Sequence, residues 1–134
     1  NSVDIIYSSH LLEHIQYEDI IVLLTECRRV LKKSGELSVS VPDFRLYVDA
    51  YIKGELYRPK ETWWLPASID TNSAIDQLNY VAYMGSEHKY LFDKENLINT
   101  LLKAGFSSAS LRDFDKNIDP EERRFESLYA RAKK

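Results

Sequence analysis

The chain has 134 residues, of which 44% are hydrophobic, and this is enough for one globular domain or a large part of one. Its formal net charge is -3 and its pI is about 5.6, so it offers no basic surface of the kind that binds nucleic acid. The single cysteine, Cys27, excludes an internal disulfide, and no apolar run approaches the ~20 residues of a membrane helix. We therefore expect a cytoplasmic protein that acts on neither nucleic acid nor membrane.

The first third of the chain predicts a strand, a helix and a second strand. Residues 3–7 (VDIIY) are a short apolar run rich in β-branched side chains, as in buried strands. Over residues 17–33 apolar side chains recur at helical spacing, with acidic residues in the first turn and lysines in the last. Gly35 stands where the residue past the helix end is expected. ELSVSVPD then alternates apolar and polar residues and stops at Pro42, which predicts the second strand.

Helices and an irregular segment follow before two closing strands. Residues 54–88 are rich in aromatic residues and predict an excursion with one short helix at about 73–83. Asp93 is placed as the N-cap of a later helix, which Gly105 ends. The remaining predicted elements are two helices and then two strands with a charged loop between them: residues 44–53, 94–104, 107–114 and 127–132. This alternation predicts an α/β sheet with parallel strands, in which ligands bind beyond the carboxyl ends of the strands.

The stretch SSHLLEHI directly follows the first predicted strand and holds two of the three histidines. His10, Glu13 and His14 match the H-x-x-E-H pattern of a family of zinc proteases. Such a site needs both histidines in the middle of a long helix and a further ligand downstream. Here the first strand ends at about Tyr7, which leaves at most two helical turns before Tyr17. The alternative is that Glu13 and His14 hold a strand-to-helix turn in place through hydrogen bonds.

Four stretches, in this order and spacing, resemble the C-terminal half of class I S-adenosylmethionine-dependent methyltransferases of the small-molecule type. They are VDIIYSSHLLEHI, TECRRVLKKSGELSVSVPDF, HKYLFDKENLINTLLKAGF and SLYARAKK. The family counterparts of the first three stretches read D-I-x-x-S-H-x-L-E-H, E-x-x-R-V-L-K-x-G-G-x-L-x-x-x-V-P-D, and H-x-x-x-F followed by L-x-x-A-G-F. The resemblance covers nearly the whole chain apart from about residues 57–87. Ser34 stands where the family usually has a first glycine, and Gly35 keeps the turn.

The resemblance implies a Rossmann-like α/β sheet of which residues 1–134 form the C-terminal portion. VDIIY and ELSVSV would be the family's fourth and fifth strands, and the closing pair its sixth and seventh, in the order 4-5-7-6 with the last strand antiparallel. The family's glycine-rich cofactor loop and its ribose-binding acidic residue belong to the other half. We therefore expect a fragment, or a half-domain completed by another chain, that binds the cofactor poorly and is inactive alone.

The implied activity is transfer of a methyl group from S-adenosylmethionine to a small-molecule acceptor, such as a sugar or another metabolite. Ser8, Ser9 and His10 are implied to lie beside the methionine end of the cofactor. Asp43 and His88 are the candidate catalytic residues: Asp43 could orient an acceptor or take its proton, and His88 could be the base. The alternative for Asp43 is an N-cap, and for His88 it is a packing role. The candidate walls of the acceptor pocket are Tyr47, Tyr83 and Tyr90.

Trp63 and Trp64 fall in the excursion over residues 54–88, where the family builds its substrate lid. They could equally form the contact of a homodimer. Cys27 lies on the helix stripe and is expected to be a small core residue. A protein of another class also fits: a non-catalytic methyltransferase-like module that binds a partner through an open sheet edge.

Metal chemistry gives two further alternatives for the SSHLLEHI stretch. One is a metal-dependent hydrolase that uses His10, Glu13 and His14. The other is a metal-assisted transferase, because some methyltransferases carry a metal near this segment; Glu13 and His14 would hold it, with His88 as a third ligand. The leading prediction needs no metal.

Overall fold

The structure is a computed structural model that describes residues 2–59 and 71–134. Trp63 and Trp64, expected in a substrate lid or a dimer contact, lie outside the described residues. The elements in chain order are β1 (Val3–Ser9), η1 (Leu12–His14), α1 (Tyr17–Val30), β2 (Leu31–Pro42), α2 (Phe44–Ile52), α3 (Ile75–Tyr83), η2 (Met84–Ser86), α4 (Lys94–Lys103), β3 (Ser108–Leu111), η3 (Glu121–Arg123) and β4 (Ser127–Lys133).

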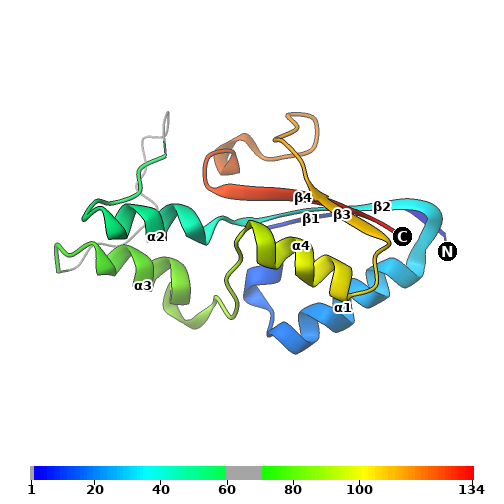
Figure 1. Ribbon diagram of the computed structural model, residues 1–134, viewed down its shortest axis with the longest axis horizontal. Helices are drawn as coiled ribbons and strands as arrows, with labels where there is room; N and C mark the ends of the chain where they lie inside the picture. The colour runs from blue at the N-terminus through cyan, green and yellow to red at the C-terminus, as the bar shows by residue number, and fades with distance from the viewer. Residues whose placement is uncertain (1, 60–70) are drawn as a thin grey trace.

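The strands form one four-stranded sheet in the order β1-β2-β4-β3 (Figure 1). β1 runs parallel to β2, and β4 is antiparallel to both of its neighbours, β2 and β3. This order and direction confirm the predicted sheet, in which the family's strands 4-5-7-6 lie side by side with an antiparallel last strand.

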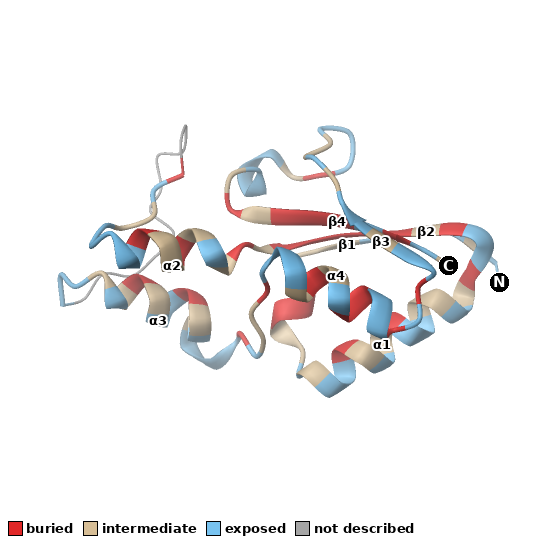
Figure 2. Ribbon diagram, viewed as in Figure 1, coloured by how far each residue is buried: buried red, intermediate tan, exposed pale blue. Residues whose placement is uncertain are grey.

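Helices α1 and α4 cover one face of the sheet, while the loop between β3 and β4 lies over the other face (Figure 1). α2 and α3 extend beyond the carboxyl ends of β1 and β2. Buried residues concentrate in β2, β4 and the sheet-facing sides of α1 and α4 (Figure 2). On the α1 stripe Ile20 and Leu24 are buried, whereas Cys27 is only half-buried. Within the described ranges, no helix has the length and apolar character to cross a membrane.

Helix α1 ends three residues earlier than predicted. Its last residue is Val30, and Leu31 already begins β2, where it pairs with Val3 of β1. Leu31 is fully buried in the core, so burial of this side chain stabilises the strand over another helical turn. The prediction that Gly35 terminates the helix is therefore wrong. Gly35 lies within β2, and no side chain fits there because the Asp4 carbonyl oxygen approaches it from β1.

We expect Gly35→Ala to lower the free energy of unfolding by about 1–3 kcal/mol, the usual range for overpacking. The added Cβ would lie 2.9 Å from Leu31 Cδ2 and 3.1 Å from the Asp4 carbonyl oxygen, and backbone cannot move aside cheaply. Urea unfolding followed by circular dichroism measures the loss. Gly54→Ala is unsuitable as a control because Gly54 has a φ of 73°, so Ser34→Ala at the neighbouring exposed position serves instead. Equal stability of Gly35→Ala and the native chain would contradict the close approach.

Strand β1 differs from its predicted burial. Ile5 is 69% exposed and Tyr7 is 38% exposed, whereas Ile6 between them packs against the core, so the exposed pair lies on the opposite face of the strand. The apolar composition of VDIIY predicts a buried strand. The strand itself is confirmed, and its burial is not.

Two aspartates cap the helices that follow the predicted turns. The Asp93 carboxylate accepts a hydrogen bond from the Asn96 N–H at 2.8 Å, which confirms the predicted N-cap of α4. The Asp43 carboxylate accepts one from the Arg45 N–H at 3.1 Å and caps α2 in the same way. Gly105, with a φ of 93°, follows the end of α4 as predicted.

The loop over the second face of the sheet is held by a buried ion pair. The Arg112 guanidinium donates to both carboxylate oxygens of Asp119, at 2.6 and 2.7 Å, and its Nε donates to Ser38 Oγ of β2. Asp119 also accepts hydrogen bonds from the Tyr7 hydroxyl of β1 and the Asp115 N–H. Its side chain is fully buried. This network fixes the loop that leads into β4 and the end of the sheet where the ligand site is expected.

Candidate functional site

Three segments meet at the carboxyl ends of the parallel strands. β1 ends at Ser9, β2 ends at Pro42, and the antiparallel β4 begins at the same edge. The His10 N–H donates to the Ser40 carbonyl at 2.9 Å, and the Asp43 N–H donates to the Glu126 carbonyl at 2.8 Å. Backbone hydrogen bonds therefore bring the ends of all three strands together, at the edge where α/β sheets bind ligands.

The residues that follow β1 make a sharp turn. His10 has a φ of 47°, in the left-handed region that non-glycine residues rarely adopt. The helical structure that follows is one 3-10 turn over Leu12–His14. His10 lies before this turn, so His10 and His14 do not share the face of a helix. The H-x-x-E-H zinc-protease site needs that shared face, and the prediction of a hydrolase using His10, Glu13 and His14 is therefore wrong.

His10 is neutral and points toward β4. Its Nε2 lies 2.6 Å from Ser127 Oγ, and its Nδ1 lies 3.5 Å from Glu13 Oε1. Burial lowers the pKa of His10 to about 3, with a further contribution from the positive charge of Arg123. The hydrogen bond between the neutral His10 imidazole and Ser127 therefore links the end of β1 to the start of β4.

The two serines before His10 lie at the end of β1 beside β2. Ser9 Oγ accepts a hydrogen bond from Ser40 Oγ at 3.0 Å. Ser8 Oγ is buried and has no hydrogen-bond partner among the described residues. A buried hydroxyl without a hydrogen-bond partner is uncommon in a folded protein.

Glu13 connects this turn to a distant part of the chain. Its backbone carbonyl accepts hydrogen bonds from the N–H groups of Lys89 and Tyr90, at 2.7 and 3.2 Å. Its side chain is only 2% exposed, and Oε2 has no hydrogen-bond partner within the described part of the chain. Burial raises the pKa of this carboxyl group.

His88 is buried close to the same turn. Its Nδ1 donates to the Val81 carbonyl of α3, which leaves Nε2 as the unprotonated nitrogen. Burial lowers the pKa of His88, so the ring is neutral near pH 7. The ring lies edge-on to the ring of His14, with centroids 4.8 Å apart. The structure therefore places His88 next to His14 and Glu13.

These side chains line a cavity of about 100 Å³, which we call the smaller cavity. It is closed on one side by Arg123 and Glu126, which form an ion pair at 2.7 Å. Arg123 comes from the segment predicted to be a charged loop and Glu126 lies just after it, and the sequence analysis missed both residues. One signal was available: because β4 runs antiparallel to β2, the residues just before β4 reach the same edge of the sheet as the carboxyl end of β2. The remaining lining residues are His10, Pro42, Tyr47, Tyr80, Val81 and Met84.

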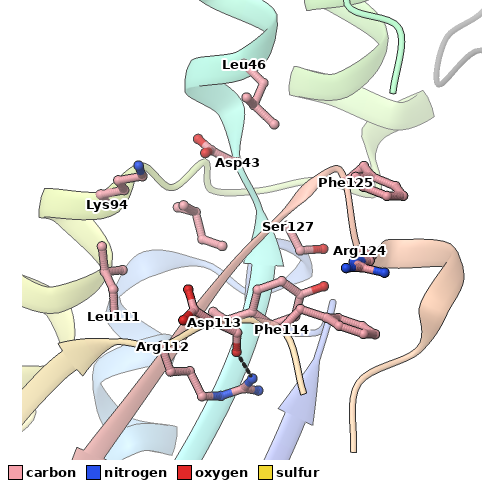
Figure 3. Close-up of a pocket in the computed structure, with 12 residues that line it drawn as sticks. Asp43, Leu46, Lys94, Leu111, Arg112, Asp113, Phe114, Arg124, Phe125 and Ser127 are labelled. Carbon is pink, nitrogen blue, oxygen red and sulfur yellow. Dashed lines mark hydrogen bonds between the residues drawn. The ribbon is translucent and has the colours of Figure 1, made fainter. Parts of the chain in front are cut away.

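A second cavity, of about 520 Å³, opens at the ends of β2 and β3, and we call it the larger cavity. Figure 3 shows Lys94 of α4 on one side and Arg124 with Phe125 on the other, with Asp43 between them at the end of β2. Asp43 is 7% exposed, and burial raises its pKa. Ser127 also lines this cavity, so its contact with His10 links the two cavities.

The structure separates several predicted site residues from one another. The two candidate catalytic residues, Asp43 and His88, line different cavities. Tyr47 lines the smaller cavity, and its hydroxyl donates to Glu126 Oε2 at 3.5 Å. Tyr83 is 64% exposed at the end of α3, and Tyr90 stacks on the ring of Tyr17 at 4.7 Å; neither lines the two cavities.

Comparison with solved structures gives the class of this fold. An S-adenosylmethionine-dependent methyltransferase from Archaeoglobus fulgidus superposes with a TM-score of 0.54 and 18% identity over 99% of this chain and 60% of that chain. Its counterpart from Mesorhizobium loti gives 0.53 and 18% over 98% of this chain and 62% of that chain. The structure of PigF with SAH gives 0.59 and 12% over all of this chain and 31% of that chain. The chain thus has the Rossmann-like fold of the C-terminal part of these methyltransferases, which confirms the predicted resemblance.

The sequence itself points to the same class. Residues 1–39, which include β1, η1 and α1, match the family of methyltransferase domains. A search of curated proteins finds no match to this sequence. The chain spans between about a third and three fifths of the length of the solved structures named above.

Proposed function

We propose that this chain forms the C-terminal part of an S-adenosylmethionine-dependent methyltransferase that acts on a small-molecule acceptor. The observation that carries the proposal is the meeting of the ends of β1, β2 and β4, with Ser8, Ser9 and His10 at the ligand-binding edge of the sheet. The fold and the match of residues 1–39 to methyltransferase domains support it. Half of the cofactor site, including the glycine-rich loop, would come from outside these 134 residues.

The cofactor is proposed to lie against the turn after β1. Ser8 Oγ offers a buried hydroxyl for a hydrogen bond to the methionine end, because none of the described residues takes it. The left-handed backbone of His10 turns the chain away at this point, so backbone groups of the turn can approach a bound ligand. The cofactor supplies the reactive methyl group, and the protein supplies position and electrostatics.

The acceptor is proposed to bind in the larger cavity. Its volume of about 520 Å³ falls in the range of small-molecule sites, whereas the smaller cavity is about 100 Å³. In methyl transfer the acceptor atom bonds to the methyl carbon as the sulfur–carbon bond breaks, and a hydroxyl acceptor also gives up a proton. Asp43 and Asp113 are the carboxylates that line this cavity, and we assign to Asp43 the role of orienting the acceptor and taking that proton, since Asp43 lies at the end of β2 and burial raises its pKa. His88 lines the smaller cavity, so we do not assign it this role.

Calorimetric titration with S-adenosylhomocysteine tests the proposal. The protein expressed from its complete reading frame is expected to bind with micromolar affinity, and the 134-residue chain in parallel is expected not to bind. In the long form, Ser8→Val should weaken binding about tenfold, the effect of one lost hydrogen bond. Ser110→Val, at an exposed serine on β3, is the matched control and should bind like the native protein.

The outcomes separate the two classes of function. Binding to the long form that is weakened by Ser8→Val and not by Ser110→Val supports the methyltransferase. No binding to the long form overturns it and leaves a methyltransferase-like module that binds a partner. Equal binding by both variants would contradict the proposed place of the cofactor beside β1.

A further inference from the structure

Two histidines and a glutamate gather in the smaller cavity from two distant parts of the chain. Glu13 and His14 belong to the turn after β1, and His88 follows η2. One ligand atom from each of these residues lies within 4.8 Å of the others. From this arrangement we propose that Glu13, His14 and His88 bind a divalent transition-metal ion.

The two imidazole rings are held in the orientation that metal-binding histidines adopt. His14 Nδ1 contacts the Glu87 carbonyl at 3.2 Å, and His88 Nδ1 contacts the Val81 carbonyl. A carbonyl oxygen only accepts hydrogen bonds, so Nδ1 carries the proton on each ring and Nε2 keeps its lone pair. Metal-bound histidines almost always donate their other N–H to a carbonyl or carboxylate in this way. Nε2 of His14 lies 3.8 Å from Glu13 Oε1.

The carboxylate of Glu13 is buried without full compensation of its charge. Its Oε2 has no hydrogen-bond partner among residues 2–59 and 71–134, and His10 approaches Oε1 only to 3.5 Å. The nearby cation, Arg123, is paired with Glu126. A buried carboxylate is costly unless it is paired or coordinates a metal, and a divalent ion beside Glu13 would compensate it.

Two imidazole nitrogens and one carboxylate oxygen suit zinc, cobalt, nickel or iron better than magnesium or calcium, which prefer oxygen ligands alone. Around a tetrahedral zinc ion, ligand atoms lie ~3.4 Å apart, so the separations of up to 4.8 Å between the three groups must shorten by up to about 1.4 Å on binding. His14 is 34% exposed and has room to move. Three protein ligands leave an open coordination position, and a cavity of about 100 Å³ is large enough for a water molecule there.

Metal binding and methyl transfer are independent inferences, since the metal would occupy the smaller cavity and the proposed acceptor the larger one. The test measures the metal alone. The 134-residue chain, shown to be folded by circular dichroism, is treated with a chelator, dialysed and titrated with cobalt chloride, with visible absorption as the readout. Calorimetry with zinc chloride gives the stoichiometry. We expect one ion per chain and cobalt absorption bands typical of mixed nitrogen and oxygen ligands.

Single substitutions assign the ligands. Glu13→Gln, His14→Gln and His88→Gln should each weaken zinc binding by at least about tenfold and alter the cobalt spectrum. Tyr83→Phe is the matched control, because Tyr83 lies on α3, is 64% exposed, lines neither cavity, and loses only a hydroxyl in the substitution. It should keep the native affinity and spectrum. Each variant is compared only after its circular dichroism spectrum matches that of the native chain.

Two results would overturn the inference. One is a folded native chain that gives no cobalt bands and no heat with zinc. The other is native metal binding that all three ligand variants retain, which would place the ion elsewhere. The first result is measured on the native chain alone. It would therefore overturn the inference even if none of the variants folds. S-adenosylhomocysteine binding is measured separately, so either proposal can fail while the other stands.

Discussion

Replacement of Asp119 by alanine is expected to lower the free energy of unfolding by about 3–5 kcal/mol, the range for removing one partner of a buried ion pair. The substitution leaves the Arg112 guanidinium, whose side chain is only 12% exposed, without its carboxylate. It also removes the acceptor for the Tyr7 hydroxyl and the Asp115 N–H. Urea unfolding of the two proteins at pH 7 measures the difference.

An exposed ion pair provides the matched control. Lys32 Nζ lies 2.8 Å from Asp4 Oδ2, but the Asp4 side chain is 72% exposed. Asp4→Ala should leave the stability of the chain unchanged, because exposed pairs gain little from their Coulomb attraction in water. An equal loss in both variants would mean that burial does not strengthen the Arg112–Asp119 pair.

The effect of Asp119→Ala should also depend on pH in a definite direction. Burial opposes ionisation of Asp119, but hydrogen bonds from Arg112 and the Asp115 N–H outweigh it and hold the pKa below its ordinary value. A depressed carboxyl pKa stabilises the fold above the pKa of the unfolded chain, about 3.9, and this stabilisation is lost as pH falls through the folded value. The stability difference between the native chain and the variant should therefore shrink below about pH 4. The raised pKa values of Glu13 and Asp43 give stability an opposite pH dependence. This contribution is the same in both proteins and cancels in the stability difference between them.

The second large effect is expected at Phe92. This ring is 2% exposed, lies among the largest fully buried side chains, and packs edge-on against Tyr90 with centroids 5.0 Å apart. Phe92→Ala should destabilise the chain by about 3–5 kcal/mol, from lost transfer energy and the cavity left behind. The measurement is again urea unfolding. The backbone carbonyl of Phe92, which accepts the Phe44 N–H, is unaffected, so the loss reports the ring.

Val22→Ala tests whether this loss comes from burial. Val22 lies on α1 and is 67% exposed, so its removal opens no cavity. The variant should lie within about 0.5 kcal/mol of the native chain, as most surface substitutions do. A Phe92→Ala protein with the stability of the Val22→Ala protein would mean that the sheet and α4 do not pack around Phe92.

The sheet was predictable because short sequence patterns indicate its strands and helices, and the order of these elements along the chain indicates how the strands are arranged. The N-cap at Asp93 and the glycine at position 105 define α4 from a few neighbouring residues. The end of α1 was not predictable from helical spacing. The two lysines after Leu31 fit a helical last turn, yet pairing of Leu31 with Val3 and its burial extend the strand instead. Tertiary packing outweighs helix propensity at such a boundary.

The site was predictable only in part. The α/β order predicts a ligand site at the strand ends, and Ser8, Ser9 and His10 lie at the end of β1. The proximity of His88 to Glu13 depends on backbone hydrogen bonds from Lys89 and Tyr90 to the Glu13 carbonyl, and main-chain groups carry no sequence signature. Asp43 and His88 line different cavities because of how α2 and α3 pack. The short-range sequence pattern does not specify this packing.

The place of β4 in the sheet has a consequence for how the chain folds. Lys133 of this strand pairs with Glu36 of β2 on one side and with Ser108 of β3 on the other. β3 has no other strand neighbour among the described residues, so it can join the sheet only after β4 has been made. During synthesis α2, α3 and α4 are made before β4, so one edge of β2 stays unpaired until β4 is available. Closing such a long loop is entropically slow, and assembly of the site at the strand ends becomes one of the last steps of folding.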